Sequence, residues 1–278
     1  MKKCGKIFLS LFLIALCSCN TASTQEAPET TNSTKEDLKE ATAEQPKGQG
    51  VLFCDSIPLE PHSPDSPKMD LDIKLEPIRL SNDMATEKAV RSISYAITDK
   101  EYSTLQEACD SYVASHISNY ENLRADYIDA KTNDGWTHWF NFYYMVNGIC
   151  SKGYKGHVNY LLQFEEYTGG AHPYSYNVAF SFDPADGHEI TLDEIMKENY
   201  EDTLLPLITQ ELMQHFKANT LEELGSYLFD PGNLFISKNI MMGADGLVII
   251  YNKYEIAPYA MGDIILEIEY DKLKEIMK

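Results

Sequence analysis

The 278-residue chain has 43 acidic and 23 basic residues, which give it a formal net charge of −20 at pH 7. Such an acidic surface repels polynucleotides and anionic lipid headgroups, and this argues against a nucleic-acid-binding protein. At this length the chain can form one large domain or two small ones around a buried core.

The N-terminus has the pattern of a secretory signal peptide. Three lysines precede an apolar run from residue 7 to residue 17, which is much shorter than the roughly 20 apolar residues of a membrane-spanning helix. Residues 16–19, Leu-Cys-Ser-Cys, resemble the bacterial lipobox. We therefore expect a signal peptide over residues 1–18, with Cys19 as the lipidated first residue of the mature protein.

This expectation places the protein in the bacterial cell envelope, held at the membrane by a lipid. Removal of residues 1–18 takes away three lysines and no acid, so the mature net charge becomes −23. Asn20 stands where an Asp commonly retains lipoproteins at the inner membrane. The sequence thus favours the outer membrane over the inner one.

The mature chain keeps three further cysteines, Cys54, Cys109 and Cys150. An envelope compartment permits disulfides, and three cysteines allow one bridge and leave one thiol. The sequence leaves open whether any two of them pair or all are buried thiols. It contains no Cys-x-x-Cys motif and no Cys/His spacing typical of zinc, so we expect neither a metal nor a cofactor.

Residues 19–69 are expected to form a disordered or extended stalk. Residues 20–50 contain almost no large apolar side chains and cannot offset the entropy of ordering themselves. Residues 51–69 are rich in proline, which indicates an extended lead-in. Regular structure is expected to begin at Asp70, because apolar and polar residues alternate strictly over 70–76, as in a half-buried strand.

Two helices are predicted next, over residues 82–97 and 103–130. The second carries an apolar and aromatic stripe with steps of three and four residues, which places its members on one face: Leu105, Cys109, Tyr112, His116, Tyr120, Leu123 and Tyr127. We therefore expect the side chains of Cys109 and His116 to pack in the core.

The rest of the chain alternates between strands and helices. Strands are predicted over 139–146, 157–165, 175–182, 247–251 and 264–270. A turn is expected at 183–187, a helix capping box at 191–194, a helix over 202–217 with Pro206 in its first turn, and a short helix at the C-terminus. This order predicts an α+β fold with helices packed on antiparallel sheets, in two small units that can share strands.

Familiar catalytic and metal-binding motifs are missing from the sequence. It has no Gly-x-Ser-x-Gly nucleophile elbow, no His-Glu-x-x-His and no phosphate-binding loop. The turn at 183–187 has Ala185 and Gly187 where a calcium loop needs oxygen ligands. His157, His172 and His188 fall in different elements, so no catalytic or metal-binding residue is assigned.

Two turn regions combine polar and aromatic residues, residues 167–174 and residues 251–262. Tyrosine is enriched in contact surfaces, and stacked rings also suit sugars. The alternative is that these tyrosines only cap the edges of the core. The candidate ligand-binding residues are Tyr167, Gly169, Gly170, His172, Tyr174, Tyr254 and Tyr259.

The motifs Tyr-Thr-Gly-Gly-Ala-His at 167–172 and Tyr-Glu-Ile-Ala-Pro-Tyr-Ala-Met-Gly at 254–262 resemble the C-terminal domain of RsiV-type anti-sigma factors, which sense lysozyme. Phe-Asp-Pro at 182–184 and residues 187–192 lie between them in the family's order. The same module occurs in PdaC-type peptidoglycan deacetylases behind a smaller domain, which residues 70–165 resemble in layout. The resemblance implies a PdaC-like domain at 70–165 and an RsiV-like domain at 166–278.

The resemblance implies a binding role only. The deacetylase's metal-binding catalytic domain is missing, and anti-sigma signalling needs a membrane-spanning helix with a cytoplasmic segment. We therefore expect a non-catalytic, lipid-anchored envelope protein that binds a lysozyme-like protein or cell-wall glycan. Two alternatives are a cell-wall sugar hydrolase or deacetylase using His172 and nearby acids, and a purely structural envelope component.

Overall fold

The computed structural model describes residues 47–133 and 135–278. The predicted signal peptide, the lipid-bearing Cys19 and most of the predicted stalk lie outside the described residues and stay predictions. Within the described part of the chain, no helix combines the length and the apolar character that crossing a membrane requires.

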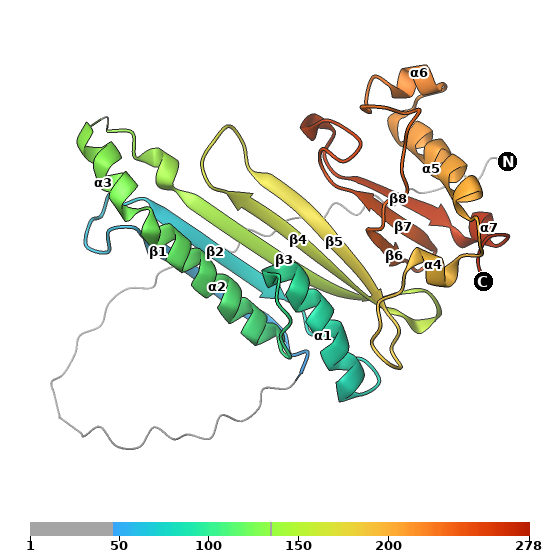
Figure 1. Cartoon of the computed structure of the whole chain (residues 1–278), viewed down its shortest axis with the longest axis horizontal. Helices are drawn as coiled ribbons and strands as arrows, with labels where there is room; N and C mark the ends of the chain where they lie inside the picture. The colour runs from blue at the N-terminus through green and yellow to red at the C-terminus, as the bar shows by residue number, and fades with distance from the viewer. Residues whose placement is uncertain (1–46, 134) are drawn as a thin grey trace, which may run out of the picture. The chain divides into compact units, whose positions relative to one another are not determined.

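Five strands form the larger sheet: β1 (Val51–Pro58), β2 (Lys68–Leu75), β3 (Phe142–Lys152), β4 (Val158–Tyr167) and β5 (Tyr174–Phe182). They lie side by side in sequence order, as Figure 1 shows. Three of the four pairings are antiparallel, and β2 runs parallel to β3. A parallel pair needs a long crossover, which the helices between β2 and β3 supply. The predicted α+β class is confirmed.

The expectation that regular structure begins at Asp70 is wrong, because β1 precedes it. β1 pairs with β2 along its whole length, from Val51 opposite Leu75 to Pro58 opposite Lys68. Val51 is buried, and Phe53 and Ile57 pack against the core from the same face of the strand. The prolines after Pro58 lie in the connection to β2, where no ladder hydrogen bond is needed from them.

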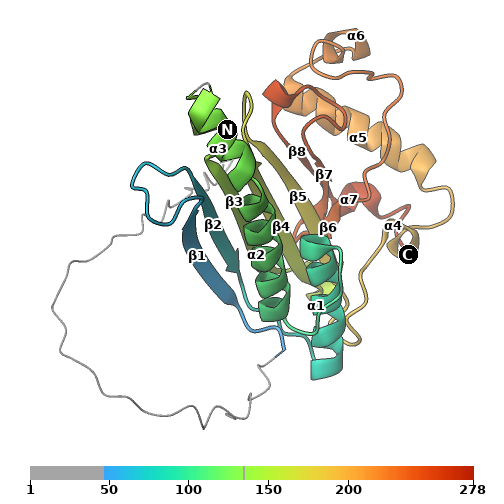
Figure 2. The same ribbon diagram turned by 60° about the vertical axis from the view of Figure 1, so that its left-hand side comes forward.

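Three helices follow β2: α1 (Asp83–Thr98), α2 (Leu105–Asn122) and α3 (Arg124–Asn133). Figures 1 and 2 show α1 and α2 on one face of the larger sheet. The single helix predicted over 103–130 is in fact two, because the hydrogen-bond ladder changes at Leu123, whose N–H donates to the Tyr120 carbonyl three residues back at 3.0 Å. α2 starts with a capping box between Thr104 and Glu107, which satisfies backbone N–H groups of its first turn.

The predicted stripe on these helices faces the core between helices and sheet. Cys109 is fully buried, and Tyr120 and Tyr127 are 1% and 2% exposed. The ring of His116 lies between those of Tyr112 and Tyr144, with centroids 4.0 and 4.1 Å away. Burial lowers the pKa of His116, so the neutral imidazole packs there as an aromatic side chain. The core roles of Cys109 and His116 are confirmed.

A second sheet is built from β6 (Ile240–Met242), β7 (Gly246–Tyr251) and β8 (Ile264–Glu269), all antiparallel. The helix α5 (Glu201–Phe216) covers it and buries Leu204, Ile208 and Leu212 in a second hydrophobic cluster. The short helices α4 (Leu192–Ile195), α6 (Leu221–Leu224) and α7 (Tyr270–Leu273) flank it.

Two local predictions in this part are wrong. Pro206 is the sixth residue of α5, in its second turn rather than its first. Thr191 makes no capping hydrogen bond to α4, and the Glu194 carboxylate lies 2.7 Å from Nε2 of His188 instead. Residues 191–194 match the capping-box motif, but the Glu194 carboxylate that would complete the box contacts the His188 imidazole instead.

The two sheets are joined by polar side chains rather than by a continuous ladder. Ser181 on β5 accepts a hydrogen bond from the Met242 N–H at 2.7 Å, and Asn159 on β4 donates to the Met242 carbonyl at 3.0 Å. The Asn239 side chain accepts from the Ala179 N–H and donates to the Asn177 carbonyl. Because β5 belongs to the larger sheet, that sheet runs across the expected domain boundary at 165–166.

Candidate functional site

The β4–β5 loop forms the first half of the candidate site. Tyr167 ends β4 and Tyr174 begins β5. Between them Gly169 and Gly170 have φ values of +90° and +106°, a region that other residues rarely adopt. A side chain on Gly169 would also come within 3.1 Å of the Trp139 carbonyl oxygen. The glycines thus allow a close turn that displays the rings on either side of it.

The structure brings the second predicted segment against this loop. The ring of Tyr259 stacks on that of His172, with centroids 4.0 Å apart and an interplanar angle of 25°. The Tyr259 hydroxyl donates to the Pro173 carbonyl at 2.9 Å. Residues 167–174 and 251–262, separate in sequence, therefore form one surface. We call its ring-bearing members the aromatic surface: Trp139, Tyr143, Tyr167, His172, Tyr254 and Tyr259, with Tyr174 at its border. The register places Tyr174 on the opposite face of β5 from Tyr143 and Tyr167, where its ring lies 5.8 Å from that of Tyr176.

Two members of the aromatic surface were not foreseen from the sequence. Trp139 is 46% exposed in the 3-10 helix η1 (His138–Phe140), which replaces the expected start of β3 at residue 139. Tyr143 stacks on Tyr167, with centroids 6.1 Å apart, because β3 and β4 pair these residues directly. Its hydroxyl donates to Glu165 at 2.6 Å, and partial burial raises its pKa. Only the strand register reveals this pair.

Tyr254 adopts a backbone conformation that is unusual for its residue type. Its φ is +69°, in the left-handed region that a bulky residue rarely enters, and the side chain is 51% exposed. Its backbone N–H donates to the Ala257 carbonyl at 3.1 Å, and its ring lies 5.8 Å from that of Tyr259. Such strain costs on the order of 1–3 kcal/mol and clusters at functional sites.

A partly buried ion pair supports the surface from below. The Lys253 ammonium lies 3.3 Å from the Asp263 carboxylate and bonds to the Ser175 hydroxyl. It also lies 5.7 Å from the centroid of the Tyr259 ring, within cation–π range. The Lys253 side chain is only 13% exposed. This lysine therefore fixes the position of Tyr259 and adds little positive charge to the surface.

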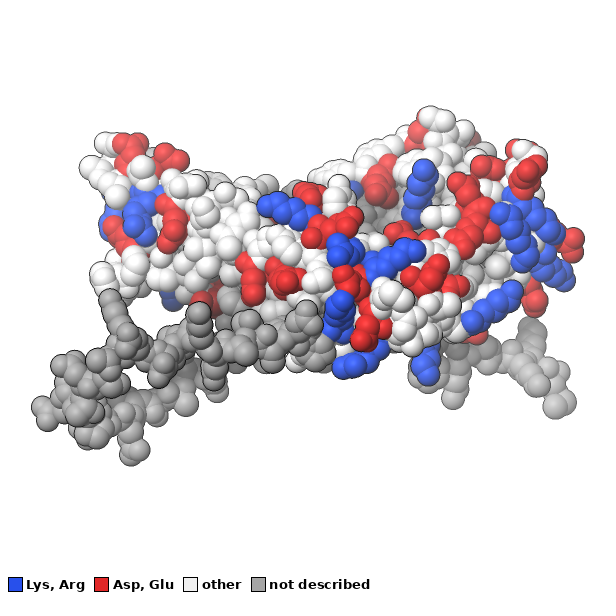
Figure 3. Space-filling model, turned by 60° about the horizontal axis from the view of Figure 1, so that its bottom comes forward, with Lys and Arg blue, Asp and Glu red and all other residues white. Residues whose placement is uncertain are grey.

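The electrostatic surroundings of the aromatic surface are acidic. Tyr174 is 40% exposed, and its pKa is raised by partial burial and by the negative charges of Glu255, Asp263 and Glu166. The phenol thus stays a neutral hydrogen-bond donor at physiological pH. Figure 3 shows lysines and acids intermingled over the face of the molecule that it draws.

The three histidines considered as ligands have different surroundings. His172 Nδ1 lies 2.9 Å from the Pro173 carbonyl, and His157 follows the 3-10 helix η2 (Tyr154–Gly156) in the β3–β4 connection. His188 lies between two carboxylates, 2.6 Å from Asp186 and 2.7 Å from Glu194. Across the described residues, no group of three or more His, Cys, Asp or Glu is placed to hold a metal ion.

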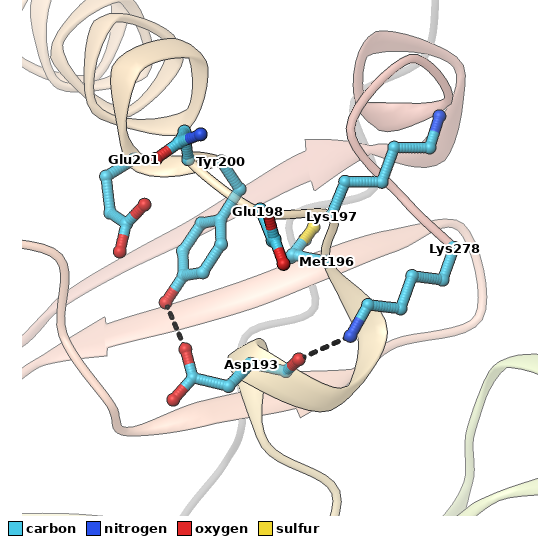
Figure 4. A pocket seen from close by; sticks show the side chains of 8 residues that line it. Asp193, Met196, Lys197, Glu198, Tyr200, Glu201 and Lys278 are labelled. Atoms are coloured by element: carbon cyan, nitrogen blue, oxygen red, sulfur yellow. Dashed lines mark hydrogen bonds between the residues drawn. The ribbon is translucent and has the colours of Figure 1, made fainter.

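A pocket of about 360 Å³ lies away from the aromatic surface, at the junction of α4 and α5 (Figure 4). In it the Tyr200 hydroxyl donates to Asp193 at 3.1 Å, and the Lys278 ammonium donates to the Asp193 carbonyl at 2.7 Å. The Lys197 ammonium bonds to the Glu275 carbonyl at 2.9 Å. These polar groups satisfy one another, so nothing in the pocket points to a particular ligand.

The sequence left the pairing of three cysteines open, and the structure shows no disulfide between any two of them. Cys54 is exposed on β1, Cys109 is buried in α2 and Cys150 is half-buried in β3.

Comparison with known proteins relates this fold to one family. Residues 193–271 match the model of DUF3298, described as a protein family of unknown function. This segment includes residues 251–262 but not the β4–β5 loop. A search of curated proteins found no match.

Two solved structures are similar over most of the chain. A DUF3298 family member from Bacteroides fragilis NCTC 9343 has a TM-score of 0.75 at 22% identity, covering 83% of this chain and 92% of its own. A DUF3298 family protein from Pseudomonas aeruginosa PAO1 has a TM-score of 0.51 at 13% identity, covering 82% and 94%. At these identities the likeness shows the fold. Residues 193–271 thus match the DUF3298 model, and the chain has the fold of solved structures from that family.

Proposed function

We propose that this protein is a non-catalytic binding protein of the bacterial cell envelope, and that the aromatic surface is its recognition site. The observation that carries the proposal is the stacking of His172 on Tyr259, which unites the two candidate segments. Exposed tyrosine and tryptophan rings give large contact areas at low cost in conformational entropy. The strained backbone at Tyr254 supports a functional rather than a purely structural role for this surface.

The proposed ligand is a lysozyme-like protein, with cell-wall glycan as the other ligand class. Both follow from the resemblance of residues 167–172 and 254–262 to the lysozyme-sensing RsiV-type domain. A basic protein fits the mature net charge of −23, which speeds its association.

We further propose that a lipid on Cys19 holds the protein at the outer membrane. The sequence pattern of residues 1–19 and the absence of Asp at position 20 support this placement. Labelling cells with a fatty acid should mark the wild-type protein and leave Cys19→Ala unlabelled, and membrane fractionation should place the label in the outer membrane. Label on Cys19→Ala would contradict the anchor, and label in the inner membrane would contradict the location.

Binding is tested with soluble residues 20–278, which keep the whole described part of the chain. Co-sedimentation with purified peptidoglycan and titration with a c-type lysozyme separate the two ligand classes. Each is done at about 50 and 150 mM salt, because salt weakens binding that depends on net charge alone. We expect saturable binding to one of them. His172→Ala should weaken it about tenfold, as substitution of a central aromatic contact does, and Tyr174→Ala at the border of the surface should weaken it less.

The matched control is Tyr95→Ala, because Tyr95 is 56% exposed on α1 and lies outside the aromatic surface. This variant should bind as the wild type does. Lysozyme binding could be lost at the higher salt and be unaffected by His172→Ala and Tyr174→Ala. This result would mean that an acidic protein merely attracts a basic one. That result, or no binding to either ligand, would contradict the proposal.

A further inference from the structure

A second surface, independent of the proposed function, lies on the outer side of α5. Here α5, α6 and the loop after α6 enclose an open groove of about 410 Å³. Its apolar lining comes from Leu205, Pro206, Met213, Leu221, Pro231 and Leu234. Leu205 and Met213 are two α5 turns apart on one helix face, next to the face that buries Leu204, Ile208 and Leu212.

The chain segment that lines the groove also has large apolar side chains exposed to solvent. Leu221 is 50% exposed, Tyr227 37%, Phe229 59% and Phe235 47%, all within a short stretch of sequence. Scattered exposed apolar residues are normal, but several large ones in one short segment that also lines an apolar groove indicate an interaction site. The loop is held in place, since the Phe229 N–H donates to the Ile256 carbonyl at 2.9 Å and Tyr251 donates to the Phe235 carbonyl at 2.6 Å.

Acidic residues outnumber basic ones in the segment that forms this groove. Residues 201–236 include six acids and a single lysine. Asp202 lies one turn before Pro206 on the same face of α5, and Glu222 directly follows Leu221. Asp230 precedes Pro231, and its carboxylate accepts from the Gly232 N–H at 3.1 Å, which fixes it at the rim. All three acids are exposed. An apolar groove with an acidic rim is complementary to a basic amphipathic segment and repels an anionic membrane.

We propose that this groove binds a basic amphipathic helix of a partner protein. Apolar side chains spaced three and four residues apart enter between α5 and the 231–234 loop. Lysines or arginines beside them pair with Asp202, Glu222 and Asp230. The partner differs in chemistry from the ligand of the aromatic surface, because it supplies a continuous apolar stripe.

The probe is a fluorescent synthetic helix of about 14 residues, with leucine at positions i, i+3, i+4 and i+7 and lysine at the other positions. A second peptide replaces every lysine with glutamate. Fluorescence anisotropy against residues 20–278 at about 150 mM salt should show saturable binding of the lysine peptide, at least tenfold tighter than that of the glutamate peptide.

Variants then locate the binding. Leu221→Ser should weaken it at least fivefold, and the triple change Asp202→Asn, Glu222→Gln, Asp230→Asn should do the same while keeping the side-chain shapes. Leu52→Ser is the matched control, since Leu52 is 77% exposed on β1 and should not matter. His172→Ala should leave peptide binding unchanged, so this test and the test of the aromatic surface can fail separately.

The proposal is overturned if the lysine peptide does not bind at a concentration of about 1 mM, or if both peptides bind equally. It is also overturned if Leu221→Ser and Leu52→Ser have the same effect, because the peptide would then only follow the net charge. Thermal unfolding of each variant checks that it is folded, and the exposed positions of the substituted residues favour this.

Discussion

The side chain of Asn252 pairs with the backbone of Asn177 as a neighbouring strand would. The Asn177 N–H donates to Oδ1 of Asn252 at 2.7 Å, and Nδ2 of Asn252 donates back to the Asn177 carbonyl at 3.0 Å. Asn177 lies on β5, whose edge would otherwise expose unpaired backbone groups. This amide pair therefore closes the sheet edge and fixes the start of residues 252–262 beside the β4–β5 loop, where the aromatic surface forms.

Replacing Asn252 with alanine should destabilise the protein and loosen the aromatic surface. Asn177 is 6% exposed, so its N–H would lose its acceptor in a buried setting, at a cost of about 1–3 kcal/mol. Urea unfolding of Asn252→Ala measures this loss. Asn233→Ala, at an exposed loop position, should change the free energy of unfolding by less than about 0.5 kcal/mol. Equal stabilities of the two variants would show that the amide pair is not structural.

The positive φ of Tyr254 should lower the free energy of unfolding of the protein. Glycine tolerates φ values near +69° and alanine does not, so Tyr254→Gly should be more stable than Tyr254→Ala by about 1 kcal/mol. Both variants should lose affinity for the ligand, because both lack the exposed ring. Chemical denaturation and ligand titration of the pair test this. A Tyr254→Gly variant with full affinity would remove Tyr254 from the recognition site.

Stability should depend on pH through His188. Its side-chain hydrogen bond to Asp186 and then that to Glu194 raise its pKa. A raised pKa in the folded state means that the contribution is full below the unfolded value of about 6.5 and is lost as pH rises through the folded value.

His188→Gln should therefore reduce the free energy of unfolding more at pH 5.5 than at pH 9. Urea titrations of the wild type and the variant at both pH values measure the difference. An equal loss at both would show that the protonated imidazole contributes nothing beyond its shape.

Cys109 should be chemically inert in the folded protein. Burial, with a smaller contribution from Asp110, raises its pKa to about 11, and the thiolate is the reactive form. Iodoacetamide at pH 8 should label the exposed Cys54 well before Cys109, as mass spectrometry of the digested protein would show. In denaturant the two should react at similar rates. Equal labelling of the native protein would contradict the buried position of Cys109.

Local patterns in the sequence predicted much of the fold. The stripe from Leu105 to Tyr127 marked the buried face of α2 and α3, since helical periodicity needs only neighbouring residues. The glycines at 169 and 170 marked the loop for the same reason. β1 was missed because residues 51–58 do not alternate cleanly, and their strand character depends on pairing with β2.

The candidate site was predicted in its parts but not as a whole. Both segments were identified, yet the contact between His172 and Tyr259 depends on how β5 meets the second sheet, which no local pattern encodes. Trp139 and Tyr143 join the surface only through the fold around β3 and β4. The Thr191 motif failed because His188 binds the acidic partner that a capping box needs.

A double-mutant cycle of His172→Ala and Tyr259→Ala, measured as affinity for whichever ligand the wild type binds, tests most directly whether the two segments form one recognition surface. If the two segments form one recognition surface, each single change weakens binding. The double change should then differ from the sum of the single ones by at least about 0.5 kcal/mol. Single variants that bind as the wild type does, or effects that add within about 0.3 kcal/mol, would contradict a shared surface.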